Sequence, residues 1–158
     1  IGAVSSYLSI VENGLPILTR SIDIGVVTIT NSIMHSLNID IKRAEQFKRD
    51  IGFDSGGAGT IPKTIETTIN PIINEIKYAF DLYSSQESAS AHVEKIILTG
   101  GSAYLPHVVD YLSGLLDIKV VIGDPWARVM YPMELKPALS ELGPRFSVAV
   151  GLAMREIE

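Results

Sequence analysis

Apolar and polar residues alternate along the first 22 positions of the chain, and afterwards the apolar residues recur every three or four positions. Residues 3–12 and 15–22 have the alternation of two strands, and Asn13 and Gly14 stand between them. Because both residues tolerate the positive φ of a tight turn, the pattern predicts an antiparallel β-hairpin. Residues 25–37 carry apolar side chains at helical spacing, which predicts a helix with one apolar side.

A strongly charged helix is predicted over residues 41–51. Asp40 precedes it as a typical N-cap, and Gly52 follows it as a typical stop signal. The glycine-rich residues 52–60 are interpreted as a mobile connection. They lack the Gly-Lys-Ser/Thr ending with which a P-loop holds phosphates and a metal ion.

Residues 61–83 form the longest helical pattern of the chain, and Pro71 lies inside it. Proline removes one backbone donor and crowds the preceding turn. We therefore expect either one kinked helix or two helices that meet at Pro71. Residues 84–92 are polar and are interpreted as a loop.

The last part of the chain alternates strands with helices. Residues 94–99 and 118–122 are apolar runs that predict two short buried strands, with a helix over residues 105–116 between them. Strands that alternate with helices imply parallel pairs joined by crossovers. Together with the hairpin, they predict an α/β fold with a mixed sheet flanked by helices.

An irregular excursion that includes one helical turn is expected over residues 123–143. It contains three prolines and the only tryptophan, Trp126, which is interpreted as a packing anchor. A closing helix over residues 144–157 is rich in small residues and is expected to pack close to a neighbour.

Composition narrows the class of protein. The 158 residues are enough for one core, and the net charge of −5 without a Lys/Arg cluster argues against nucleic acid as the main partner. The chain has no cysteine, which excludes disulfides and thiolate metal sites, and no apolar run is long enough to span a membrane. The first residue is Ile1 rather than methionine, so we expect a piece of a longer protein.

Two short patterns carry candidate chemistry. Gly100 and Gly101 join a strand to a helix start, a layout that brings bare backbone close to a ligand, although such turns are common in α/β proteins. Glu45 and Lys48 are three residues apart on one helix face. They could contact a ligand, and the alternative interpretation is an ordinary surface salt bridge between them. The three histidines are too scattered to suggest a shared metal ion.

Taken in order, these patterns resemble the actin-like ATPase superfamily over essentially the whole chain. The hairpin resembles its second phosphate motif, with Ser6 in the place of the motif's threonine; the chain begins one residue after the place of the motif's aspartate. Glu45 and Lys48 match its Glu-x-x-Lys helix, and the Gly100 turn is similar to its adenosine motif. The segment around Tyr83 favours, within this superfamily, the PilM family of type IV pilus assembly proteins over the related FtsA.

The resemblance implies the second lobe of a two-lobed protein. This lobe would have an RNase H-like core, about residues 1–37 and 62–158, and a small helical insert, about residues 38–61. The first lobe, with the other phosphate turn and the groups that position the metal ion, would lie outside this chain.

The resemblance also implies a nucleotide site for ATP with Mg²⁺. The implied nucleotide-binding residues are Gly2, Ala3, Ser5, Ser6, Glu45, Lys48, Gly100, Gly101 and Ser102. No catalytic residue and no metal ligand is assigned to this chain. At most a weak ATPase is expected for the full-length protein, and no hydrolysis for this half of the cleft alone.

The implied role is that of a cytoplasmic scaffold, peripheral to the inner membrane through its partners. Its partners would be the cytoplasmic tail of a PilN-like inner-membrane protein and other proteins of the pilus platform, and it could form a homo-oligomer. Two alternatives remain at this point: an FtsA-like cell-division protein, and a kinase-type enzyme of the same superfamily.

Overall fold

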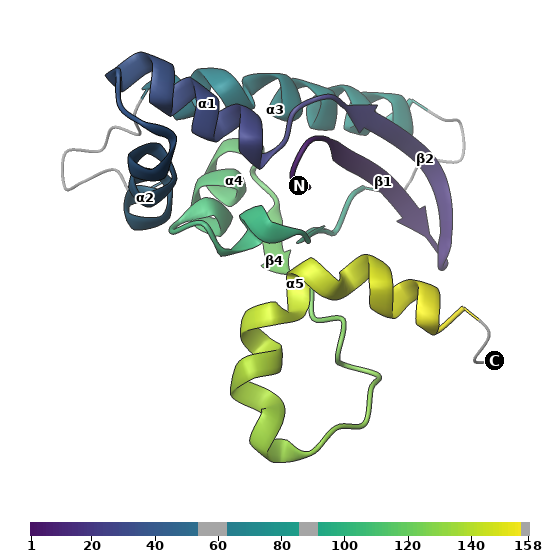
Figure 1. Cartoon of the computed structure of the whole chain (residues 1–158). Coiled ribbons are helices and arrows are strands. Elements are labelled where there is room, and N and C mark those ends of the chain that lie inside the picture. The colour runs from purple at the N-terminus through teal and green to yellow at the C-terminus, as the bar shows by residue number, and fades with distance from the viewer. Residues whose placement is uncertain (54–62, 86–91, 156–158) are drawn as a thin grey trace.

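The computed structural model describes residues 1–53, 63–85 and 92–155. The elements are, in order, β1 (Ser6–Glu12), β2 (Leu15–Ile22), α1 (Val26–Leu37), α2 (Ile41–Ile51), α3 (Lys63–Ser84), β3 (Lys95–Leu98), η1 (Gly101–Tyr104), α4 (Val108–Leu116), β4 (Lys119–Ile122), η2 (Met133–Leu135) and α5 (Lys136–Ala153). Figure 1 shows α1 and α3 as a layer above the strands, with α5 below them.

The predicted hairpin and the first two helices are confirmed. β1 and β2 pair antiparallel, and Asn13 and Gly14 turn between them with φ of 51° and 80°. The Asp40 carboxylate accepts hydrogen bonds from the N–H groups of Lys42 and Arg43 at 2.9 and 3.0 Å and so caps α2. The expected connection over residues 52–60 and the loop over 84–92 lie mostly outside the described residues.

Helix α3 is one continuous helix, so the alternative of two helices meeting at Pro71 is wrong. Pro71 lies on the exposed face of the helix. Because proline has no N–H, the carbonyl of Thr67, four residues earlier, lacks its usual helical hydrogen bond, and Thr67 is also exposed. Water can bond to that carbonyl, which explains why the helix continues through the proline.

The core is formed by buried side chains of α1, α3, α4 and the β3–β4 pair. The isoleucines of α3 provide much of it, as the helical spacing predicted. Its buried residues include Ile29, Ile33, Ile65, Ile69, Ile73, Leu98, Val108, Leu112 and Val120. A smaller cluster of Ile10, Ala79 and Tyr83 joins the end of α3 to the hairpin.

The strand directions are mixed, as predicted, because β3 and β4 pair in parallel. Within the described residues the two pairs are not hydrogen-bonded to each other, so the structure has two two-stranded sheets. The strands were expected to be buried, but Ile97 is 58% exposed and Ile122 is 41% exposed. Leu98 and Val120 of this pair are buried in the core, whereas Ile97, which points to the opposite face, is mostly exposed.

The closing helix begins at Lys136, not near residue 144 as predicted, and Pro144 lies inside it. Proline has no N–H to donate to Ser140, four residues earlier. The Ser140 carbonyl instead accepts a hydrogen bond from the Tyr104 hydroxyl. This side chain provides the bond that the proline cannot, and it ties α5 to the turn after β3.

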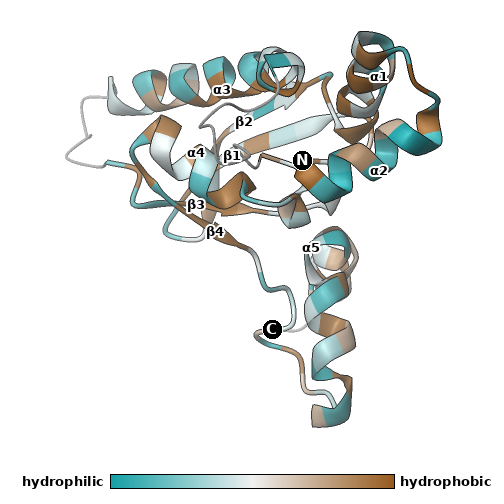
Figure 2. Cartoon of the chain, turned by 90° about the vertical axis from the view of Figure 1, so that its left-hand side faces the viewer, coloured by the Kyte–Doolittle hydropathy of each residue, from teal (hydrophilic) through white to brown (hydrophobic). Residues whose placement is uncertain are grey.

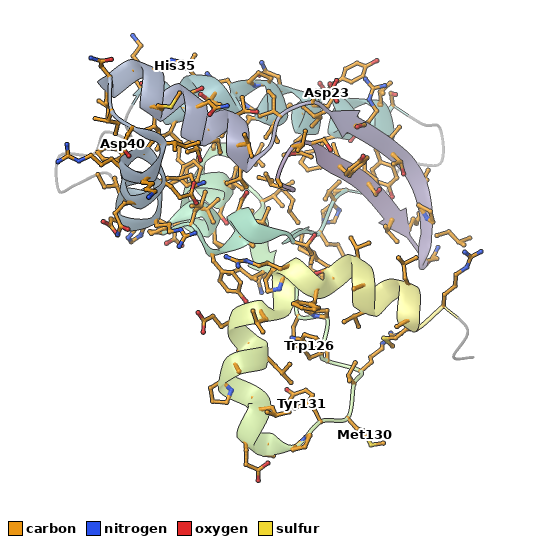
Figure 3. All side chains as sticks on the ribbon, viewed as in Figure 1. Asp23, His35, Asp40, Trp126, Met130 and Tyr131 are labelled. Carbon is orange, nitrogen blue, oxygen red and sulfur yellow. The ribbon has the colours of Figure 1, made fainter. Side chains whose placement is uncertain are left out.

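The excursion before α5 is held by Trp126, as predicted. The indole N–H donates to the Leu139 carbonyl at 2.7 Å, and the ring packs against Phe146 with centroids 6.0 Å apart. Figure 3 shows Trp126 close to α5, whereas Met130 lies at the far end of the excursion, where it is fully exposed. Across the described ranges, no helix is long and apolar enough to cross a bilayer.

Candidate functional site

A cavity of about 850 Å³ lies where the N-terminal turn, α2 and the turn after β3 meet. Seven of the nine residues implied by the sequence line it together. They are Gly2, Ala3, Ser5, Glu45, Lys48, Gly100 and Gly101. Residues of the N-terminal turn, of α2 and of the turn after β3, which are far apart in the sequence, thus form one candidate site.

Gly100 has a backbone conformation that requires glycine. Its φ and ψ are 90° and 175°, a region that residues with a side chain rarely adopt. A Cβ added there would lie only 2.2 Å from the Ile1 carbonyl oxygen. The Gly100 N–H donates to the Pro144 carbonyl at 2.8 Å, which fixes the turn against α5.

The N-terminal turn presents backbone donors to the same cavity. The Gly2 N–H bonds the Ser5 carbonyl at 3.0 Å, and the carbonyls of Gly2 and Ala3 accept from the first N–H groups of α1. No backbone hydrogen bond among the described residues uses the N–H of Ala3, Val4 or Ser5. Free N–H groups on a tight turn are a common receptor for anions.

Glu45 and Lys48 form a hydrogen-bonded group with Thr30 of α1. Lys48 is 2% exposed, and its ammonium donates to Glu45 Oε2 at 2.6 Å and to Thr30 Oγ1 at 2.7 Å. Arg49 Nε donates to the other carboxylate oxygen at 3.3 Å. Lys48 is therefore not part of a solvated surface salt bridge, and it orients the Glu45 carboxylate at the cavity wall.

The pKa of Glu45 reflects two opposed effects. Burial raises it, because the charged carboxylate loses water. The hydrogen bonds from Lys48 and Thr30 and the charge of Lys48 lower it by more, so the pKa lies below its ordinary value. Glu45 is thus a carboxylate at neutral pH and can only accept hydrogen bonds, as from sugar hydroxyls.

The two remaining implied residues lie outside this cavity. The Ser6 hydroxyl is buried and donates to the Ile24 carbonyl at 2.6 Å, on the face of the hairpin that packs on the core. Ser102 is also buried, with its hydroxyl 3.5 Å from the Ile1 carbonyl. Both hydroxyls hold neighbouring backbone in place.

Sequence reasoning did not assign several of the lining residues to the cavity, among them Arg49, Tyr104 and Arg145. With Lys48, the two arginines give this wall three cations against one carboxylate, an electrostatic balance that favours an anionic ligand. Arg49 directly follows Lys48, so its place on the same helix could have been predicted. Arg145 lies 100 positions after Glu45, and no local spacing could have placed it here.

The described residues hold no group of three or more His, Asp or Glu side chains that could bind a metal ion. Glu45 is the one carboxylate among the described residues that line the cavity, and it already accepts from two cations. This wall therefore suits a nucleotide or another anion better than a metal ion on its own.

Solved structures with this fold define the class of protein. The chain is similar to a chain of the PilM–PilN type IV pilus biogenesis complex, with 26% identity, a TM-score of 0.80, and coverage of 100% of this chain and 44% of that chain. It is also similar to MreB 5 of Spiroplasma citri bound to AMPPNP, with 15% identity, a TM-score of 0.66, and coverage of 99% and 51%.

A third similar structure is the ethanolamine utilization protein EutJ from Carboxydothermus hydrogenoformans, with 18% identity, a TM-score of 0.58, and coverage of 98% and 47%. These likenesses show an actin-like α/β fold, and the chain spans about half the length of each of these proteins.

The family model described as type IV pilus assembly protein PilM matches residues 1–157. The chain belongs to this family, which confirms the resemblance read from the sequence and favours it over the FtsA-like alternative. No curated protein sequence matches the chain.

Proposed function

We propose that this chain is the second lobe of an ATP-binding scaffold protein of type IV pilus assembly. Its core and small helical insert form half of a nucleotide cleft. The nucleotide acts as a structural ligand that holds the two lobes together, which stabilises the closed form by mass action. The observation that carries the proposal is the one cavity shared by the N-terminal turn, Glu45 and the Gly100 turn.

The cavity wall suits each part of a nucleotide. The free N–H groups of residues 3–5 are available to phosphate oxygens, and the surrounding cations favour their charge. The oriented Glu45 carboxylate is available to ribose hydroxyls, and the side-chain-free Gly100 and Gly101 leave room for a flat group. Mg²⁺ would be positioned by the first lobe and by the phosphates, since this wall offers no free carboxylate.

The decisive test is a calorimetric titration of Mg-ATP into the longer protein that includes the first lobe. Glu45→Gln keeps the shape of the side chain and is expected to weaken binding about tenfold, because a charge-assisted hydrogen bond is lost. Asp50→Asn is the matched control on the same helix, since Asp50 lies outside the cavity and, among the described residues, bonds only Gln46. Equal affinities for the parent protein and Glu45→Gln would contradict the proposed site.

The partner proposal rests on the likeness to the PilM–PilN complex over the whole chain. We expect the longer protein to bind the cytoplasmic tail of a PilN-like inner-membrane protein, and thereby to dock on the pilus platform from the cytoplasm. Titration of that tail peptide, with and without Mg-ATP, tests this role. A kinase-type enzyme would instead turn over ATP with an acceptor, whereas this chain alone is expected to show no hydrolysis.

A further inference from the structure

Thr30 of α1 lies at the centre of the hydrogen-bonded group at the candidate site. It is 4% exposed and lines the cavity together with Glu45 and Lys48. Its hydroxyl oxygen lies 2.7 Å from Lys48 Nζ, 2.9 Å from Glu45 Oε2 and 3.1 Å from the Val26 carbonyl oxygen. A single buried hydroxyl thus contacts a cation, a carboxylate and the backbone of its own helix.

The chemistry of these groups fixes the direction of each hydrogen bond. An ammonium can only donate, so the Thr30 oxygen accepts from Lys48. A hydroxyl has one proton, and this proton goes to the Glu45 carboxylate rather than to the Val26 carbonyl, because the charged acceptor binds it more strongly and lies closer. Thr30 and Lys48 therefore donate to the same carboxylate oxygen, Oε2.

The two oxygens of the Glu45 carboxylate consequently have different surroundings. A carboxylate has about four acceptor sites, two on each oxygen. Both sites on Oε2 are taken by Thr30 and Lys48. Among the described residues, Oε1 accepts only from the exposed Arg49, at 3.3 Å, so it has room for a further donor. The carboxylate is held through one oxygen and can accept from a ligand through the other.

Thr30 also relates this carboxylate to the N-terminal turn. The Val26 N–H, at the start of α1, donates to the Gly2 carbonyl at 3.0 Å. Thr30 lies one turn further along the same helix, and Figure 2 shows α2 lying beside α1. A continuous set of hydrogen bonds therefore runs from the N-terminal turn through α1 to Glu45 on α2. The two parts of the cavity wall keep a fixed relative position as long as this set is complete.

The placement of α2 itself does not depend on the Thr30 hydroxyl. Ala44 of α2 is completely buried in the core, and so is Phe53, which follows the helix. The Phe53 N–H donates to the Pro106 carbonyl at 2.8 Å, which holds the end of α2 against the segment after β3. These contacts keep the helix in place, so the hydroxyl acts on the orientation of the Glu45 side chain.

We propose that Thr30 is a positioning residue for the recognition of the ribose: it fixes the Glu45 carboxylate so that Oε1 accepts from ribose hydroxyls. This inference deepens the proposed function and rests on it. Thr30 acts on the nucleotide through Glu45, whose second oxygen it holds together with Lys48. The nucleotide class that the site favours is therefore a ribonucleotide with free 2′ and 3′ hydroxyls.

A purely structural role of Thr30 makes a different prediction. If the hydroxyl served only to provide the buried Lys48 with a partner, its loss would weaken the binding of every nucleotide to the same extent. A positioning role confines the loss to nucleotides that carry ribose hydroxyls. Mg-ATP and Mg-2′,3′-dideoxy-ATP differ only in these hydroxyls, so the two affinities together distinguish the roles.

The experiment is a calorimetric titration of both nucleotides into the longer protein that includes the first lobe. Thr30→Val keeps the branched shape and removes the hydroxyl, whereas Thr30→Ser keeps the hydroxyl and tests for rescue. Thr68→Val is the matched control, because it removes a hydroxyl of α3 that bonds the Thr64 carbonyl at 2.7 Å outside the cavity. Urea unfolding shows that each variant is folded at the temperature of the titration.

The parent is expected to bind Mg-ATP about tenfold more tightly than the dideoxy nucleotide, because the latter lacks the hydrogen bond to the carboxylate. Thr30→Val is expected to bind Mg-ATP about fivefold more weakly and the dideoxy nucleotide as the parent does, so its preference falls to about twofold. Thr30→Ser and Thr68→Val are expected to keep the parent's preference.

A second variant covers the case in which Thr30→Val does not fold. Thr30→Val combined with Lys48→Met removes the ammonium together with the hydroxyl, so no buried cation is left without a partner. It is expected to lose the preference as well. Retention of the preference by the folded variant, equal weakening of both nucleotides, or no preference in the parent would overturn this inference alone. Failure of the parent to bind Mg-ATP would overturn the proposed function and this inference with it.

Discussion

Lys48 is a lysine with almost no exposed surface, and it stands beneath the wall of the candidate site. Its ammonium bonds Glu45 and Thr30, so the interaction is a partly buried ion pair and not a surface contact. Removing one partner of such a group leaves the other charge without compensation. Any change at Glu45 therefore affects stability as well as binding, and the two effects must be measured separately.

The first prediction concerns pH. The folded-state pKa of Glu45 is lowered, so its contribution to stability is complete above the ordinary carboxyl pKa of about 4.3 and is lost as the pH falls through the lower folded-state value. Urea unfolding of the parent chain and Glu45→Gln is compared from pH 7 to pH 3. The stability difference is expected to be largest at neutral pH and to shrink below about pH 4. A constant difference down to pH 3 would contradict this assignment.

The second prediction concerns the two glycines of the turn after β3. Gly100→Ala is expected to destabilise the chain by about 1–3 kcal/mol from backbone strain alone, and the clash with the Ile1 carbonyl adds to it. Gly101→Ala is the matched control, because its new methyl group would meet only the Arg145 side chain at 3.8 Å. Urea unfolding gives the free energy of unfolding of both variants. Equal losses of stability would show that position 100 has no greater need for glycine than position 101.

At the scale of elements, the position of Glu45 depends on how α2 begins. Asp40→Ala removes the cap and is expected to cost about 0.5–2 kcal/mol of stability. Asp50→Ala, near the other end of the same helix, removes a surface bond to Gln46 and is expected to change stability by less than about 0.5 kcal/mol. Thermal unfolding followed by circular dichroism compares them, and similar losses would exclude a specific role of the cap.

Helix α5 and the site are coupled through Tyr104. Tyr104→Phe removes the hydroxyl that bonds Ser140 and is expected to cost about 0.5–1.5 kcal/mol. Pro144→Ala returns a helical donor to the Ser140 carbonyl, so the tyrosine change should cost less in that background. A double-mutant cycle by urea unfolding measures this coupling. Strictly additive effects would mean that the Tyr104 hydroxyl and the N–H introduced at position 144 do not compete for the Ser140 carbonyl.

The sequence was a good guide wherever local chemistry decides structure. The Asn13 and Gly14 turn, the Asp40 cap and the isoleucine spacing of α3 all predicted their elements. The start of α5 was missed because the rule against proline inside a helix does not foresee a tyrosine hydroxyl that replaces the lost donor. The proposed break of α3 at Pro71 was wrong because proline is tolerated inside a helix where the carbonyl that it leaves without a donor faces water, and the sequence alone did not reveal this.

The site was only partly predictable. Residues on the two turns and on one face of α2 line one cavity in the structure. Ser6 and Ser102 did not, because their hydroxyls bond to nearby backbone. Arg145 could not be found from spacing, since only the packing of α5 against the Gly100 turn brings it to the cavity.

For the molecule as a whole, the separation of the two strand pairs is the feature that no local pattern predicted. Each pair looked like part of one sheet in the sequence, because strand periodicity does not say which strands are neighbours. The chain spans 44% of the length of the chain that it matches in the PilM–PilN complex.

The bond between Ile1 and Thr99 joins residues that are 98 positions apart, and this separation has a consequence for the rate of folding. Contacts of such long range form late, because the chain between them must first be ordered. The hairpin and α2 are closed by local turns and are expected to form early. In pulse-labelling exchange, Leu8 should gain protection before Val121, whose N–H points toward β3. The cavity between the two turns would be the last region able to hold a ligand.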